Sequence, residues 1–232
     1  EIPCRDLELK PLLDRMDDVY RGTSSHARVS MRVITANWER EIEIEAWSEG
    51  TKKSLMRILS PRKEKGTATL MVDDNVWNYL PKVKRVIKVP SSMMGGSWMG
   101  SHFTNDDLVK QNRMAEEYRF EKTFVGEREG QSLIEVTCTP LEDAAVVWGK
   151  LVVLVDEPTC LPVKQLYYDE DMALARTMTF AEPKTFDGRT LPTVMRVVPA
   201  DKPKELTEVR YHEIHFDVNL PKNTFSLRTL KR

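Results

Sequence analysis

The chain has 232 residues, a mass of 26.8 kDa and nearly balanced charge, with 35 Lys and Arg against 36 Asp and Glu. A net charge of −1 argues against nucleic-acid binding, which depends on a basic surface that neutralises phosphates. The best apolar run, 144–155, is interrupted by Lys150 and is shorter than the roughly 18–20 residues of a membrane-spanning helix. We therefore predict one globular domain over residues 1–232 that binds no nucleic acid and does not span a membrane.

The first segment has the periodicity of an amphipathic helix that ends before Gly22. Its charged face carries residues such as Asp14 and Asp18. Its apolar stripe consists of Leu9, Leu12, Leu13, Met16, Val19 and Tyr20. A helix with two such different faces needs a large apolar surface to cover.

Most of the remaining chain alternates between apolar and polar residues, which predicts strands with one buried and one solvated face. The alternation is clearest in 27–33 and 39–46. Further runs follow at 53–59, 67–72, 75–80, 83–89, 117–125, 132–139, 145–155, 161–169, 173–181, 190–199 and 205–218. The pattern predicts a mainly β protein of about a dozen antiparallel strands with one long helix in front.

Residues 91–110 interrupt the strand pattern. Glycines and methionines fill 91–100, and a short helix is expected from about residue 104. Thr104 is the predicted N-cap, and Asp107 three residues later completes a pair that resembles a capping box. The methionines, Trp98 and Phe103 either fill the core of the sheet or cover an apolar cavity, because methionine adapts to variable apolar shapes.

The three cysteines have no metal-ligand spacing, and an odd number cannot form a closed set of disulfides. Cys138 and Cys160 are expected at opposite ends of an antiparallel meander, roughly 25 Å apart at the rise of a strand. A disulfide needs Cα atoms within about 7 Å. We therefore expect free thiols.

Catalytic and metal sites are weakly indicated. His212 and His215 are expected on opposite faces of one strand, so they cannot share a metal ion. The only compact polar cluster is Ser101 and His102 beside Asp106 and Asp107, and loop and capping roles explain all four residues. We predict no enzyme activity, no cofactor and no metal, with catalysis by this cluster as the less favoured alternative.

Basic residues are concentrated in 51–90, which contains ten Lys and Arg but only three acidic residues and therefore has a net charge of +7. This segment is either a solvated sheet edge protected by lysines or a docking surface for an acidic partner or anionic headgroups.

Several motifs in the same region are similar to those of the LolA-like outer membrane lipoprotein-sorting proteins. They are LMRILSPRKEKG at 55–66, VWNYLPKVKR at 76–85, SSMM at 91–94, SWMGS at 97–101 and FTNDDL at 103–108. The similarity is dense in 55–108 and weaker after about residue 130. At His102 the family pattern has Asp, so the resemblance implies no carboxylate role at that position.

The resemblance implies a curved open antiparallel sheet, an unclosed half-barrel of about 11 strands, with helices covering its concave face. It also implies a periplasmic location in a Gram-negative cell envelope, with a signal peptide removed. The implied cargo is the acyl chains of lipoproteins or another lipid, and the implied partners are an inner-membrane exporter and an outer-membrane acceptor.

We therefore hypothesise a non-enzymatic carrier or chaperone that holds an acyl chain in an apolar cavity for sorting to the outer membrane. Leu9, Leu12, Leu13 and Met16 are the predicted lid. The predicted lining is Trp77, Tyr79, Met93, Met94, Trp98, Met99 and Phe103. A shift of one residue in strand register would exchange inward and outward side chains.

The alternative hypothesis is a periplasmic adaptor of a membrane export machine that docks through the basic region 52–88. The candidate docking residues are Lys82, Lys84, Arg85 and Lys88.

Overall fold

The computed structural model describes residues 2–110 and 113–232. Within them, thirteen strands form one antiparallel sheet in the order β6-β5-β4-β3-β2-β1-β13-β12-β11-β10-β9-β8-β7. The strands are β1 (Ser24–Ile34), β2 (Glu39–Glu49), β3 (Lys53–Ser60), β4 (Ala68–Val72), β5 (Asn75–Leu80), β6 (Arg85–Lys88), β7 (Tyr118–Arg128), β8 (Gln131–Pro140), β9 (Lys150–Asp156), β10 (Leu161–Tyr168), β11 (Leu174–Phe186), β12 (Arg189–Pro199) and β13 (Leu206–Phe216). Because β6 and β7 are the unpaired edges, the sheet is open.

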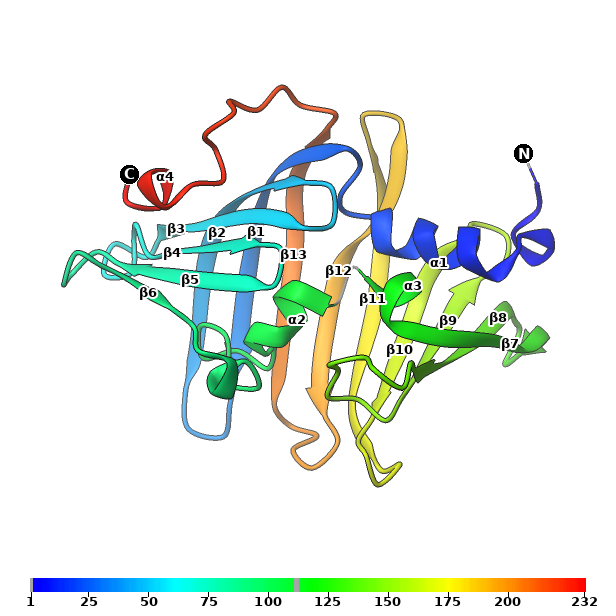
Figure 1. Cartoon of the computed structure of the whole chain (residues 1–232). Coiled ribbons are helices and arrows are strands. Elements are labelled where there is room, and N and C mark those ends of the chain that lie inside the picture. The colour runs from blue at the N-terminus through cyan, green and yellow to red at the C-terminus, as the bar shows by residue number, and fades with distance from the viewer. Residues whose placement is uncertain (1, 111–112) are drawn as a thin grey trace.

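The helices α1, α2 and α3 cover the concave face of this curved sheet, as Figure 1 shows, whereas α4 packs on the opposite face. In that view α2 lies in front of the central strands, and α1 and α3 lie in front of the strands toward β7. α4 lies at the other end, beside β3 and β4. The helices are η1 (Cys4–Asp6), α1 (Leu9–Asp18), η2 (Ser91–Met93), α2 (Asn105–Lys110), α3 (Met114–Glu117) and α4 (Leu227–Leu230).

The structure confirms the predicted fold class, an open half-barrel with helices. The N-terminal helix begins at Leu9 as predicted and ends at Asp18, and Gly22 turns the chain into β1 with a φ of 58°. A Cβ on Gly22 would approach the Arg189 guanidinium within 2.9 Å, so glycine also provides space. The run predicted from 145 becomes a strand only at Lys150. No sequence pattern predicted α3 or α4.

The inward face of the sheet carries the main core, which follows from strict alternation in the central strands. On β1, Ala27, Val29, Met31 and Val33 are buried, and the residues between them are charged or polar. On β13 a bulge opposite the Arg28–Val29 step changes this phase. As a result Tyr211 points inward, although simple alternation would place it on the face opposite Ile214.

Cys4 and Cys160 form a disulfide with a Cα–Cα distance of 5.5 Å, so the prediction of free thiols is wrong for these two residues. Strand spacing correctly separated Cys138 from Cys160, but the position of Cys4 depends on where the N-terminal helices cross the sheet. Cys138 is free and fully buried, and burial raises the pKa of its thiol to about 12.

Asp17 connects α1 to α3. Its carboxylate is buried and accepts hydrogen bonds from the backbone N–H groups of Met114 and Ala115, both at 3.3 Å. Burial raises the pKa of Asp17 to about 7, and the two N–H donors oppose this effect only partly.

The raised pKa predicts that stability falls as the pH rises. The folded protein keeps a proton on Asp17 that the unfolded chain loses near pH 4, so the stabilisation is complete below that pH and is lost through pH 7. The free energy of unfolding should fall by about 2 kcal/mol between pH 5 and pH 7 because of this group alone. When the free energy of unfolding is measured by urea titration at several pH values, Asp17→Asn should remove this part of its decrease with pH. Asp171→Asn, at an exposed position before β11, should keep it, and equal slopes in all three proteins would contradict the prediction.

Candidate functional site: a cavity under the 91–110 segment

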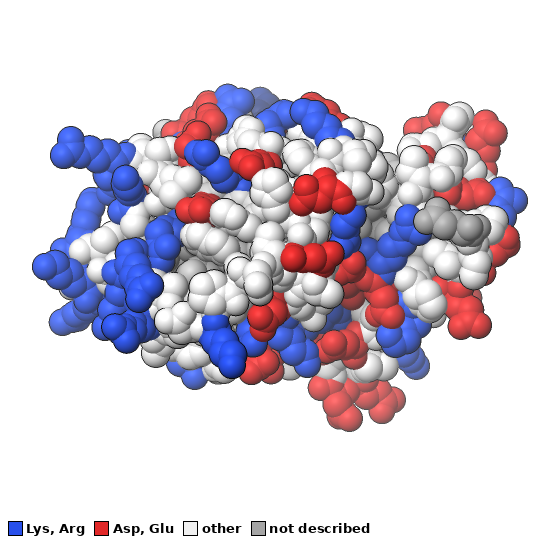
Figure 2. Space-filling model, turned by 90° about the horizontal axis from the view of Figure 1, so that it is seen from above, with Lys and Arg blue, Asp and Glu red and all other residues white. Residues whose placement is uncertain are grey.

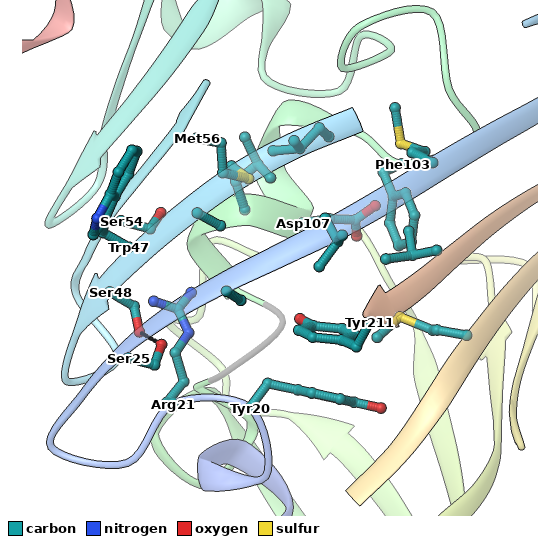
Figure 3. A pocket seen from close by; sticks show the side chains of 18 of the residues that line it. Tyr20, Arg21, Ser25, Trp47, Ser48, Ser54, Met56, Phe103, Asp107 and Tyr211 are labelled. Atoms are coloured by element: carbon teal, nitrogen blue, oxygen red, sulfur yellow. Dashed lines mark hydrogen bonds between the residues drawn. The ribbon is translucent and has the colours of Figure 1, made fainter. Parts of the chain in front are cut away.

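A cavity of about 170 Å³ lies between the inward face of the central strands and the 91–110 segment. Figure 3 shows side chains from both sides meeting around it. Its apolar lining is contributed mainly by β1, β2, β3, β12, β13 and α2. These residues are Ala27, Val29, Met31, Ile44, Ala46, Met56, Trp98, Phe103, Leu108, Met195 and Val209. The polar groups are Tyr20, Arg21, Ser25, Ser48, Ser54, Asp107 and Tyr211, and Trp47 completes the wall.

The 91–110 segment is attached to the sheet through buried polar contacts. The indole N–H of Trp98 donates to Thr69 Oγ1 at 3.0 Å. Asp107 accepts two hydrogen bonds from Arg176 of β11, both at 2.7 Å. We call this part of the chain, residues 91–110, the cover segment.

The predicted capping pair at the start of α2 is confirmed. The Asp107 N–H donates to the Thr104 hydroxyl at 3.1 Å, and the Thr104 N–H donates to the Asp107 carboxylate at 2.8 Å. Asp107 therefore serves both the helix start and the ion pair with the sheet.

Burial shifts the pKa values of two polar groups of the cavity, Arg21 and Tyr211. Desolvation lowers the pKa of Arg21 to about 10, and the nearby Arg113 cation contributes in the same direction. Desolvation raises the pKa of Tyr211 to about 12, against the opposing influence of Arg21. The Tyr211 ring stacks on Tyr20 with a centroid distance of 4.7 Å, and the Tyr20 hydroxyl donates to the Pro192 carbonyl at 2.8 Å.

Of the predicted lining residues, Trp98 and Phe103 line the cavity, and both are buried. The three methionines do not line it. Met93 is 60% exposed, Met94 packs against a separate small core cluster that contains Val109, and the Met99 carbonyl accepts a hydrogen bond from Arg40.

Trp77 and Tyr79 lie on the opposite face of the sheet, which corrects their predicted position. They pair with Leu70 and Ala68, and this side of β4 packs against Leu230 of α4. Thr69 lies between Ala68 and Leu70 on β4 and faces inward, where its hydroxyl accepts the hydrogen bond from the Trp98 indole. The sequence showed the alternation of β5 but not its phase, and the phase decides which residues face inward.

The predicted lid residues Leu9, Leu12, Leu13 and Met16 belong to the main core. Leu12 and Leu13 are fully buried, and Met16 borders a separate small cavity of about 30 Å³. α1 thus covers the β7–β10 part of the concave face, while the cover segment lies over the 170 Å³ cavity.

Most residues of the cavity floor, including Arg21 and three serines, are absent from the predicted lining. The feature that could have predicted them is the set of inward-facing residues on each strand. On β1 these are Ser25, Ala27, Val29 and Met31, which change from small and polar to large and apolar. Small inward side chains on neighbouring strands leave unfilled space.

The Ser101–His102 cluster is bonded into the fold and does not assemble with the two aspartates. The His102 ring hydrogen-bonds to Thr207 at 2.7 Å and to Glu205 at 2.9 Å, both on or beside β13. The Ser101 hydroxyl donates to the Trp98 carbonyl at 2.7 Å. These contacts give each group a structural role.

The candidate docking residues lie at one edge of the sheet. Arg85 and Lys88 are on the edge strand β6, and Lys82 and Lys84 are in the turn before it. Figure 2 shows Lys and Arg gathered at this end of the molecule, and the other end is richer in Asp and Glu. The C-terminal segment around α4 contacts β4 at the same end. It adds Lys222, Arg228, Lys231 and Arg232. The bases on β6 can be explained as charges that protect an exposed sheet edge from pairing with another chain, so docking at this edge stays a prediction.

The overall architecture matches three solved structures over nearly the whole of each chain. A domain described as an outer membrane lipoprotein-sorting protein domain, from Vibrio parahaemolyticus, is 27% identical with a TM-score of 0.84, over 96% of this chain and 98% of that one. A DUF1329 family protein from Desulfovibrio piger is 23% identical with a TM-score of 0.87, over 95% and 97% of the two chains. A LolA superfamily protein from Nitrosomonas europaea is 20% identical with a TM-score of 0.80, over 96% and 99%. The protein therefore has the LolA-like fold.

The model of a protein family described as "-like: Uncharacterized protein" matches residues 50–232. Because this match covers well over half of the chain, the protein belongs to that family. A search of curated proteins finds no match. Among the described residues, no helix is both long and apolar enough to cross a membrane.

Proposed function

We propose that the protein is a periplasmic carrier that shields an acyl chain or a similar apolar ligand in the cavity under the cover segment. The observation that carries this proposal is the 170 Å³ cavity itself, whose floor and cover are mostly apolar. Native interiors are normally packed without voids of this size, so unfilled apolar space of this kind is a candidate binding site.

The volume of the cavity limits how much of an acyl chain it can hold. A cavity of about 150 Å³ binds benzene, so about six carbon atoms fit in 170 Å³. At about 0.8 kcal/mol per buried methylene, six carbons contribute about 5 kcal/mol of gross binding free energy. The cavity is partly open, so the carbons of a longer chain beyond these six would lie outside it.

Two further observations support the carrier assignment. The relative from Vibrio parahaemolyticus is described as a lipoprotein-sorting domain, and its likeness to this chain extends over nearly the whole of both. The Cys4–Cys160 disulfide suits the periplasm, because disulfides persist in oxidising compartments. Binding by apolar burial alone requires neither a cofactor nor catalysis. Delivery from an inner-membrane exporter to an outer-membrane acceptor is part of the proposal.

Filling the cavity tests this function. Ala46→Leu places a larger side chain among the lining residues, and Glu41→Leu adds the same side chain at an exposed position of the same strand. We expect the native protein and Glu41→Leu to retain lipid that extraction and mass spectrometry detect, and to bind a fluorescent fatty acid. Ala46→Leu should bind it at least tenfold more weakly, which corresponds to about 1.4 kcal/mol.

The proposal fails if the native protein is reproducibly empty and does not bind the fluorescent fatty acid. It also fails if both variants bind as the native protein does while circular dichroism shows that each is folded.

A further inference from the structure

One end of the cavity is polar, and its polarity follows from the register of three strands. Ser25 of β1 pairs with Ser48 of β2, and Ser48 pairs with Ser54 of β3, so three serines form a row across the sheet. Cross-strand partners lie on the same face, here the inward face. One of the Ser25 and Ser48 hydroxyls donates to the other, which leaves one hydroxyl hydrogen of the pair for another acceptor.

Arg21 lies at the same end and has no anionic partner among the described residues. Its side chain enters the cavity from the turn between α1 and β1, as Figure 3 shows. Arg21 is only 9% exposed. One terminal nitrogen donates to the carbonyls of Gly50 at 3.5 Å and Lys53 at 3.2 Å, which hold it beside the β2–β3 turn.

A buried guanidinium without a carboxylate is costly, and the surrounding charges do not reduce this cost. The other buried cation nearby, Arg113, disfavours the charge on Arg21. Asp107, the carboxylate that lines the cavity, is already engaged by both terminal nitrogens of Arg176. Buried charges are normally paired with an opposite charge, and the two carbonyl contacts of Arg21 supply none, so this end of the cavity suits an anionic group.

Tyr211 supplies a second donor. Its hydroxyl forms no hydrogen bond with another described residue, and in Figure 3 it points across the cavity toward the side of Arg21. The stacking on Tyr20 fixes the ring. From the row of Tyr211 onward the floor is apolar, because Tyr211 pairs with Val29, and Val209 pairs with Met31 in the next inward row.

We propose that the cavity binds a single-chain anionic amphiphile whose carboxylate or phosphate lies between Arg21, Tyr211 and the serine row, with its chain along Val29, Met31 and Phe103. This inference rests on the proposed function and narrows its cargo. The favoured ligand carries a charged head, whereas the esters and amides of a lipoprotein's acyl chains are neutral. A charge-assisted hydrogen bond to the anion would compensate the buried cation, which a neutral head cannot do.

The test uses the full chain and eight-carbon ligands that differ only in the head group. Isothermal titration calorimetry should show octanoate or octyl phosphate binding at least tenfold more tightly than octanol. The two anions, measured separately, identify which head the site prefers. Arg21→Gln should weaken the preferred anion by about 10- to 100-fold and leave octanol binding unchanged. Arg28→Gln makes the same charge change on the exposed outward face of β1 and should have no effect.

A second variant covers the case in which Arg21→Gln does not fold. Tyr211→Phe keeps the stacked ring and removes only the hydroxyl, and it should weaken the anion by about tenfold without affecting octanol. Equal affinities for octanol and the anions, or equal losses for all three ligands in the variants, would overturn the anionic head while leaving the apolar carrier intact. No binding of any of the three ligands would overturn both.

Discussion

Asp107→Ala is expected to lower the free energy of unfolding by about 3–5 kcal/mol, because it leaves a buried cation without its partner. The side chains of Asp107 and Arg176 are 6% and 5% exposed, and their two hydrogen bonds are both 2.7 Å long. Burial disfavours the Arg176 cation, but the Asp107 carboxylate reverses this and raises the pKa of Arg176 overall. The substitution also removes the acceptor for the Thr104 N–H at the start of α2.

Urea denaturation of two companion variants separates the ion pair from other effects. Asp106→Ala removes a neighbouring carboxylate of α2 whose pKa burial raises to about 6, so its loss should cost little stability. The double variant Asp107→Ala/Arg176→Met should recover much of the loss, because no charge then remains buried. A loss below about 1 kcal/mol for Asp107→Ala would show that the pair does not hold the cover segment on the sheet.

Loss of the Cys4–Cys160 disulfide is expected to cost about 2–5 kcal/mol, because it releases a constraint between residues 156 positions apart. The bond attaches η1, and through it the start of α1, to the turn between β9 and β10. The ion pair between Arg5 and Glu157 lies beside the bond and reinforces the same attachment. The backbone amides of the core residues Leu12 and Leu13 should therefore exchange hydrogen faster when the bond is broken.

Cys4→Ser, Cys160→Ser and the double variant should lose the same stability, and dithiothreitol should affect only the native protein. Thiol titration in denaturant gives an independent check. The native protein should show one free thiol, from Cys138, before reduction and three afterwards. Three thiols before reduction, or unequal losses in the two single variants, would contradict the pairing.

Local sequence patterns predicted the elements that depend on local physics. The stripe of α1 and the Thr104–Asp107 cap could be predicted because helix periodicity and capping involve residues within four positions of each other. The alternation of β1 and β2 likewise predicted antiparallel strands with one buried face, and the family resemblance implied that the sheet is open. The motifs of 55–108 indicated the LolA-like fold.

The site was predictable only in part, because its geometry depends on contacts between distant segments. Trp98 and Phe103 could be predicted as candidates because they are large apolar residues in a segment without strand periodicity, but the pattern left open whether they fill the core or cover a cavity. Trp77 and Tyr79 could not be placed, because α4, more than 140 residues away in the chain, covers their face of the sheet.

By itself, the sequence determined the open antiparallel sheet, the amphipathic helix across it, the capped cover segment and the concentration of bases in 51–90. Only the tertiary structure decided that Cys4 meets Cys160, that Asp107 meets Arg176, and that Arg21 enters the cavity without a described carboxylate as its partner. The physical reason is range. Periodicity and capping act over a few residues, whereas a disulfide, a buried ion pair or an unpaired charge depends on how the whole sheet curves and where each helix crosses it.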